Sequence, residues 1–384
     1  MRELWKLFGK FEAEPSMCAL GYPPHITLAV YDAIAEQKLR TALRDVFSNI
    51  ECMRLRFGRI AVFEGPRPVF WAAPDDYDLA RDYCSYGYFL LRPNHWDVKR
   101  RVFTRAFSID KVPFAVEVSQ KGPGGRLAVA SSRSLSARSK GTVERWLTRM
   151  LRLDEHAGVI AEFHALDPRW KASGRGRLMR SPTMFEDVIK TVTSCNVTWP
   201  NTVQMNRRLC EVLNPAAGKA APIHPFPEVK QMASTRPQTL RARCRVGYRD
   251  QRMVELARMF RSGAIDPEWY EDLSTPDGDV YEALMELPGV GPYAAANIMQ
   301  LLGRYGRLPL DTESVRHGKK VLGYEGTPAQ VMKKVHAHYA PFGAHAFRSY
   351  WFELWDFYET KHGRAWTWER DSTGKMFTAA LLNK

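Results

Sequence analysis

The chain has 384 residues, with 56 lysines and arginines against 42 aspartates and glutamates, which gives a net charge of +14. This length accommodates about two or three domains, and the basic balance favours a polyanionic partner with salt-sensitive binding. We expect a cytoplasmic protein, because the sequence lacks both an apolar leader and an apolar run of the roughly eighteen residues that a membrane span requires.

Residues 1–78 carry one short motif, His25-Ile26-Thr27, followed by a predicted helix near 33–47 and strand-like runs near 52–72. This pattern resembles one half of a 2H phosphoesterase, an enzyme with two His-x-Ser/Thr motifs facing each other across a groove. Only one such motif is present here. A single short motif favours the alternative, an α/β docking module in which His25 packs near the start of a strand.

The apolar side chains change period along the rest of the chain. Apolar and polar residues alternate between about 84 and 140, interrupted by Lys121-Gly122-Pro123-Gly124-Gly125, which predicts strands and a hairpin. From Thr142 onward the period is helical. We predict an α+β fold with an N-terminal α/β module (1–78), a small antiparallel sheet domain (79–140) and a mostly helical, two-lobed body (141–384).

Two basic runs and two polar turns lie within the helical body. The runs span residues 169–180 and 241–261, and although a charge run is more often a solvated face, two of them favour a DNA-binding surface. A capped helix opening at Ser181-Pro182-Thr183 is predicted to end at Ser194-Cys195-Asn196. The second turn is Gly247-Tyr248-Arg249.

Residues 279–302 predict two helices joined by a very short turn, Leu287-Pro288-Gly289-Val290-Gly291. The glycines permit positive φ and close backbone approach, and Pro292 suits the first helical position. The turn therefore presents free amides at a helix N-terminus, where a phosphate is stabilised. An ordinary helical hairpin, in which the glycines only serve the turn, is the alternative.

Asp311 follows the hairpin within Leu308-Pro309-Leu310-Asp311-Thr312. It suits the N-cap of a helix, and a fixed carboxylate can also stabilise positive charge on a sugar and activate a water. Further on, residues 347–355 place aromatic side chains at helical spacing, a pattern that is more often core than pocket.

The hairpin and its downstream aspartate resemble the helix-hairpin-helix-GPD superfamily of DNA glycosylases, in its 8-oxoguanine and 3-methyladenine glycosylase branch. The resemblance implies that Asp311 attends the scissile glycosidic bond. It also implies that the hairpin grips the DNA backbone through Gly289, Val290, Gly291 and Tyr293. Members that also cut the strand have a lysine at the position of Tyr293, so the resemblance implies a monofunctional enzyme that leaves an abasic site.

The same resemblance implies roles for residues in the other segments. Asn196 fills the space left by a flipped base, Tyr248 wedges beside the orphaned base, and Arg249 hydrogen-bonds to that base. Such insertions offset the unstacking cost of base flipping. Phe347 and Trp351 are predicted to line the pocket that receives the flipped base.

The predicted partner is double-stranded DNA, and the chain is expected to act as a monomer, associated with the nucleoid if it is bacterial. The resemblance implies K+ or Na+ bound by the backbone carbonyls of Met285, Leu287 and Val290, and no organic cofactor. The six cysteines form no Cys-x-x-Cys pair and none follows Cys244, so neither zinc nor an iron–sulfur cluster is expected.

Two other functions stay open, namely a non-catalytic binder of modified or distorted DNA and a phosphoesterase acting through His25. The base excised is also open. Repair of damaged bases and removal of hypermodified bases from phage DNA both remain hypotheses.

Overall fold

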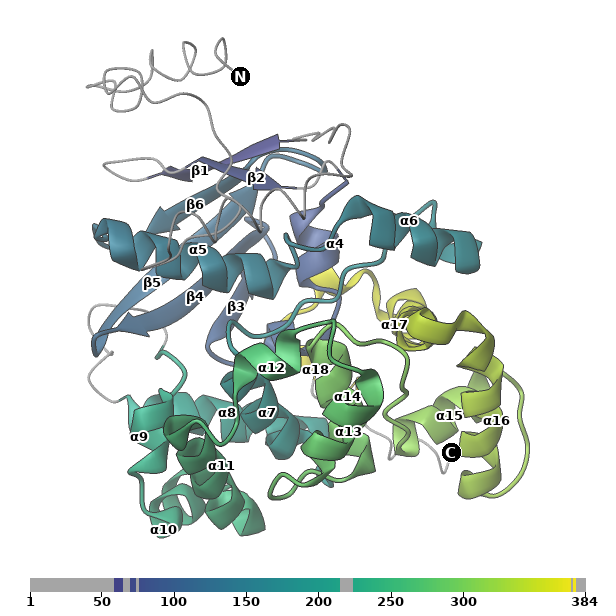
Figure 1. Cartoon of the computed structure of the whole chain (residues 1–384). Coiled ribbons are helices and arrows are strands. Elements are labelled where there is room, and N and C mark those ends of the chain that lie inside the picture. The colour runs from purple at the N-terminus through teal and green to yellow at the C-terminus, as the bar shows by residue number, and fades with distance from the viewer. Residues whose placement is uncertain (1–58, 65–69, 74–75, 215–223, 374–375, 378–384) are drawn as a thin grey trace, which may run out of the picture. The chain divides into compact units, whose positions relative to one another are not determined.

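The computed structural model describes residues 59–64, 70–73, 76–214, 224–373 and 376–377 (Figure 1). The motif at His25 lies outside these residues. The described part has the predicted α+β fold, with a small sheet and a larger helical body.

The sheet has six strands in the order β2-β1-β6-β5-β4-β3 (Figure 1). Their bounds are β1 Arg59–Glu64, β2 Phe70–Ala73, β3 Asn94–Asp97, β4 Val102–Ile109, β5 Val112–Gln120 and β6 Leu127–Ser131. Strands β3 to β6 are antiparallel neighbours, whereas β1 pairs parallel with β6 and antiparallel with β2. The sheet therefore includes residues 59–64 and 70–73, which the sequence analysis assigned to the N-terminal module.

Two hairpins connect the central strands. The turn between β4 and β5 is Asp110-Lys111, and both residues have positive φ, as a two-residue type I′ turn requires. The hairpin predicted at 121–125 is confirmed between β5 and β6, where Gln120 pairs with Leu127.

Helix α5 (Ala137–Leu151) lies across one face of the sheet (Figure 1). Its predicted apolar face is buried at Val143, Leu147 and Met150. Trp146 on the same helix stacks on Phe107 of β4, with ring centroids 5.1 Å apart. The helix thus closes the core of the sheet lobe, because its apolar stripe meets the apolar face of the strands.

The remaining helical segments follow in chain order. They are α4 Leu79–Tyr83, η1 Gly87–Leu90, α6 Ala157–Leu166, η2 Pro168–Trp170, α7 Met184–Ser194, α8 Trp199–Leu213, α9 Val229–Ala233, α10 Pro237–Thr239, η4 Leu240–Cys244, η5 Gly247–Arg249, α11 Asp250–Ser262, α12 Pro267–Glu271, α13 Asp277–Met285, α14 Pro292–Leu301, α15 Thr312–Lys320, α16 Pro328–Tyr339, η6 Ala340–His345, α17 Ala346–His362, η7 Ala365–Thr367 and α18 Arg370–Thr373. Within the described ranges, no helix combines the length and apolar character needed to cross a membrane.

The apolar side chains form two cores. One contains strands β3 to β6, α5 and the C-terminal helices α15 to α17, and the other contains α7, α8, α9, α11, α13 and most of α14. Helix α14 contributes to both, since Ile298 lies in the second core and Leu301 in the first. The described residues therefore form two lobes with α14 between them, and the sheet shares its lobe with the C-terminal helices.

A buried ionic cluster also joins the lobes. Arg105 of β4 donates to Glu186 of α7 at 2.5 Å, and the Lys190 ammonium lies 2.7 Å from the same carboxylate. All three side chains are almost fully buried. Because an unpaired charge there would be costly, the sheet and α7 are fixed together by this cluster.

Candidate functional site: a glycine hairpin beside a capping carboxylate

The hairpin between α13 and α14 has the predicted geometry. Gly289 has φ +80°, a conformation that favours glycine, and Gly291 is extended at φ −105°. The N–H of Val290 donates to the carbonyl of Leu287 at 3.0 Å and the Val290 side chain is buried, which fixes the turn. Pro292 is the first residue of α14, and both Gly291 and Pro292 are exposed.

The amides of Gly289 and Gly291 donate to no hydrogen-bond acceptor within the described part of the chain. They lie at the N-terminus of a ten-residue helix, where the peptide dipoles favour an anion. The arrangement can accept a phosphate through backbone amides, without contact to a base.

Asp311 is the N-cap of α15, as the sequence predicts. Its Oδ1 accepts hydrogen bonds from the backbone N–H of Glu313 at 2.9 Å and of Ser314 at 3.1 Å. The Asp311 N–H donates to the Ser314 hydroxyl at 3.2 Å, which completes a capping box. No described residue donates to Oδ2 of Asp311, so one carboxylate oxygen anchors the side chain and the other is available.

Burial raises the pKa of the Asp311 carboxyl to about 6, against an ordinary value of 3.8, although its backbone hydrogen bonds act in the opposite direction. The side chain is half-buried. A carboxylate with this pKa is ionised at neutral pH and is still basic enough to accept a proton from water.

Three tyrosines lie near enough to Asp311 to respond to its charge. Burial raises the pKa of Tyr86, Tyr293 and Tyr350, and the negative charge of Asp311 raises each further. Tyr293 is the second residue of α14, so the carboxylate lies beside the helix that follows the hairpin. Tyr350 also exchanges a hydrogen bond of 2.9 Å with the Ser314 hydroxyl, which ties α17 to the cap.

The predicted DNA-probing residues Asn196, Tyr248 and Arg249 are brought together. Asn196 follows α7 in a left-handed conformation with φ +49° and is exposed, and Tyr248 is 52% exposed. Arg249 is buried and donates to the carbonyls of Val192, Val246 and Cys195. It therefore holds the end of α7 in place, and contact with a base would require these bonds to be given up.

The two predicted pocket aromatics differ in position. Trp351 is half-buried and packs against Tyr86 with the rings tilted by 48° and their centroids 4.7 Å apart. It donates its indole N–H to the Ser85 carbonyl at 2.8 Å. Phe347 is fully buried between Tyr305 and Trp351. It supports Trp351 from the core, and in this conformation it has no exposed face on which a base could stack.

Sequence reasoning missed the polar residues beneath the site. Tyr86 donates to Asn297 of α14 at 2.7 Å, and Asn297 donates to the Thr191 hydroxyl of α7 at 3.2 Å. Tyr88 shares a hydrogen bond of 2.9 Å with Thr191. The signal was an asparagine within the apolar second helix of the hairpin, where a buried amide requires partners. This network fixes α14 against α7 and the segment before η1.

Three of the five basic residues in the run at 169–180 are buried, so they cannot contribute to the DNA-binding surface that the sequence analysis inferred. Arg175, Arg177 and Arg180 are buried, and the first two are paired with Glu359 and Asp76. Buried cations require hydrogen-bond acceptors. These guanidinium groups find them on other segments of the chain and so hold those segments together.

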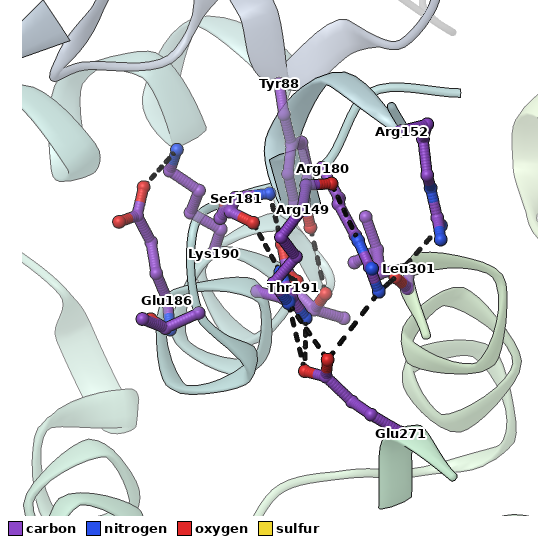
Figure 2. A network of polar contacts seen from close by, with 12 residues as sticks. Tyr88, Arg149, Arg152, Arg180, Ser181, Glu186, Lys190, Thr191, Glu271 and Leu301 are labelled. Atoms are coloured by element: carbon purple, nitrogen blue, oxygen red, sulfur yellow. Dashed lines mark hydrogen bonds and ion pairs between the residues drawn. The ribbon is translucent and has the colours of Figure 1, made fainter. Parts of the chain in front are cut away.

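Arg180 shows the structural role of this run, which is to bind backbone carbonyls in the interior. It donates to the carbonyls of Arg149 and Leu301, at 3.0 Å each, and Figure 2 shows it beside Arg149, Arg152 and Glu271. Burial, together with the neighbouring Arg149 and Arg152, lowers the pKa of Arg180 to about 9. Arg180 therefore fixes the C-terminal end of α14, whose N-terminal end carries the hairpin.

The other basic run, 241–261, does remain at the surface. Arg243, Arg245, Arg252, Arg258 and Arg261 are exposed, on the segment that leads into and through α11. An exposed basic surface beside the hairpin is the arrangement that binds a polyanion.

Comparisons with known proteins find the fold but no close relative. Similar solved structures are the 3-methyladenine DNA-glycosylase from Archaeoglobus fulgidus (17% identity, 76% of this chain, 97% of that chain, TM-score 0.55), the apo 8-oxoguanine glycosylase/lyase from Clostridium acetobutylicum (16%, 78%, 100%, 0.57) and MBOgg1 in complex with a low-affinity DNA ligand (18%, 78%, 99%, 0.58). No family model and no curated protein matches the chain. The chain therefore shares its fold with these DNA glycosylase structures, and the comparisons give no support for the half phosphoesterase.

Proposed function

We propose that this chain, which has the fold of the 8-oxoguanine and 3-methyladenine glycosylases, is a monofunctional DNA glycosylase acting on a modified base in double-stranded DNA. The observation that carries the proposal is that the two carboxylate oxygens of Asp311 differ in their hydrogen bonding. Its Oδ1 is fixed by two backbone amides, while Oδ2 accepts no hydrogen bond from the described residues. The charge of Asp311 acts on Tyr293, in the helix that follows the hairpin, and raises the pKa of that phenol.

The reaction uses the two parts of the site differently. The amides of Gly289 and Gly291 hold a phosphate of the strand that carries the target nucleotide. The N-glycosidic bond breaks and its electron pair leaves with the base, while positive charge develops on the sugar and is stabilised by Asp311. Water attacks C1′ and gives one proton to Oδ2, which later releases it to solvent, while the departing base nitrogen, which has kept the bonding pair, takes up a proton from solvent.

We place Asn196 and Tyr248 in the duplex at the extruded nucleotide, and Trp351 against the extruded base. Exposure of Asn196 and Tyr248 supports this, because an inserted side chain must reach beyond the protein surface. Arg249 acts through the segment that carries Asn196, since two of its three carbonyl acceptors, Val192 and Cys195, lie just before Asn196.

We also propose that a monovalent cation binds at the hairpin, as the resemblance implies. The carbonyls of Met285, Leu287 and Val290 would hold it, although the Leu287 carbonyl already accepts the Val290 N–H. Bound there, the ion would neutralise carbonyl dipoles and add positive potential near the phosphate. Among the described residues, no cluster of three or more His, Cys, Asp or Glu side chains could bind a metal.

The test is base release from duplexes that each carry one modified base, including oxidised and alkylated purines, enlarged pyrimidines and the hypermodified bases of phage DNA. Mass spectrometry identifies the freed base, and Asp311→Asn serves as the matched variant. We expect wild-type protein to free a base and Asp311→Asn to bind the same duplex without freeing it. If wild-type protein binds every duplex and frees nothing, the chain is a binder of modified DNA.

Monofunctional action has its own readout, because Tyr293 stands where strand-cutting relatives have lysine. We expect the product strand to remain intact until hot alkali is added. We also expect borohydride to trap no covalent protein–DNA complex. Trapping by wild-type protein would assign a Schiff-base lysine and refute this part of the proposal.

A further inference from the structure

Arg252 lies at the meeting point of the hairpin and the predicted wedge. It is the third residue of α11 and is exposed. A Cβ placed on Gly289 would lie 2.7 Å from Cδ of Arg252, so the aliphatic part of this side chain packs directly on the hairpin glycine. Only glycine suits this position, because the backbone has a positive φ and a side chain would collide with Arg252.

The guanidinium of Arg252 also reaches the exposed aromatic ring. It lies 5.4 Å from the ring centroid of Tyr248, and the guanidinium of Arg249 lies 4.5 Å from the same centroid. Arg249 is occupied by carbonyl groups, whereas Arg252 forms no ion pair with any carboxylate of the described residues. The nearest carboxylate in sequence, Asp250, is paired with Arg241 at 2.9 Å.

We propose that Arg252 binds the phosphate gripped by the hairpin and, through its contact with Tyr248, aligns the wedge with that phosphate. This inference rests on the proposed function. A guanidinium can donate two hydrogen bonds to a phosphate while its planar face stays against an aromatic ring. Binding of the DNA backbone and insertion of the Tyr248 ring are then coupled, because Arg252 takes part in both.

The experiment separates the two parts of this role with variants at one position. Arg252→Met keeps an aliphatic side chain over Gly289 and removes the charge, whereas Arg252→Lys keeps the charge and removes the planar group. Arg138→Met is the control, since Arg138 is also an exposed arginine in the first turn of a helix, α5. The probe is a duplex with a tetrahydrofuran abasic analogue opposite 2-aminopurine.

Two quantities are measured for each protein, the Kd over a series of salt concentrations and the 2-aminopurine fluorescence of the saturated complex. For Arg252→Met we expect Kd to rise about tenfold and the slope of log K against log salt to fall by about 0.9. Arg252→Lys should keep the slope and lose the fluorescence increase that reports the inserted ring. Arg138→Met should match wild-type protein in both measurements.

Tyr248→Ala completes the design. If Arg252 aligns the ring, the fluorescence losses of Arg252→Lys and Tyr248→Ala are not additive in the double variant. The inference is overturned if Arg252→Met keeps the wild-type salt slope, or if Arg252→Lys keeps the wild-type fluorescence. Both readouts use a duplex with no base to release, so failure of the proposed chemistry would not affect them.

Discussion

Replacing Asp311 by asparagine should stabilise the protein while it removes activity. Asparagine has the same shape, and its carbonyl can accept the two backbone hydrogen bonds that now reach Oδ1. It carries no charge, so it avoids the cost of burying a carboxylate in its present position. We therefore expect the substitution to raise the free energy of unfolding at neutral pH.

The magnitude follows from the pKa of Asp311, which burial raises from 3.8 to about 6. At 1.36 kcal/mol per pH unit this change corresponds to about 3 kcal/mol at pH 7.5. Because the folded state binds the proton more tightly than the unfolded state, stability is lost as the pH rises from 3.8 to 6 and is constant above. The advantage of asparagine should therefore fall to about 1.6 kcal/mol at pH 5. The half-exposed position makes these values upper bounds.

Urea denaturation of both proteins at pH 5 and pH 7.5 measures this difference directly. Asp266→Asn is the control, because Asp266 caps α12 at an exposed position and should change stability by less than about 0.5 kcal/mol. An Asp311→Asn protein that is no more stable than wild type at pH 7.5 would refute the argument. So would a difference that is the same at both pH values.

The same pKa predicts the pH dependence of base release. The reaction requires the ionised carboxylate, so the single-turnover rate should be constant above about pH 6 and fall roughly tenfold per pH unit below it. A rate that rises as the pH falls below 6 would assign the essential group as an acid and contradict the role given to Asp311.

The remaining predictions concern stability and binding. Glu186→Ala leaves the cations of Arg105 and Lys190 buried without their carboxylate, and urea denaturation should show a loss of about 3–5 kcal/mol; a loss below about 1 kcal/mol would contradict the closed cluster. In Gly289→Ala the new methyl group would stand on a residue with positive φ and would collide with Arg252. The free energy of unfolding should therefore fall by about 1–2 kcal/mol, and DNA binding should weaken. Gly291→Ala has open space and ordinary φ, so its free energy of unfolding should stay within about 0.5 kcal/mol of wild type, and equal losses at the two glycines would refute this account of the turn.

The local sequence was sufficient to predict a structural feature wherever residues a few positions apart determine its conformation. The hairpin needs glycine for positive φ and proline for the first helical turn, and these requirements are met within Gly289 to Pro292. The cap at Asp311 is equally local, because its partners are two and three residues away. Such patterns can be read from the sequence, and the structure has them in the predicted places.

Tertiary structure decided which charged and aromatic side chains reach the surface. Arg177 and Arg252 belong to similar arginine-rich runs, but Arg177 is buried and paired with Asp76, whereas Arg252 is exposed beside the hairpin. Phe347 and Trp351 are one helical turn apart, yet the first is fully buried and the second is half-buried. Burial depends on what packs from distant segments, and the sequence alone does not specify those neighbours.

The sequence by itself thus determined the turn, the cap and the alternation of strands and helices, because these depend on backbone conformation and on contacts within a few residues. Only the folded chain determined that Asp311, Tyr293 and Tyr86 share one environment, since they come from three separate segments. The raised pKa of Asp311 belongs to that second class, because desolvation is a property of everything packed around a carboxylate and not of its place in the chain.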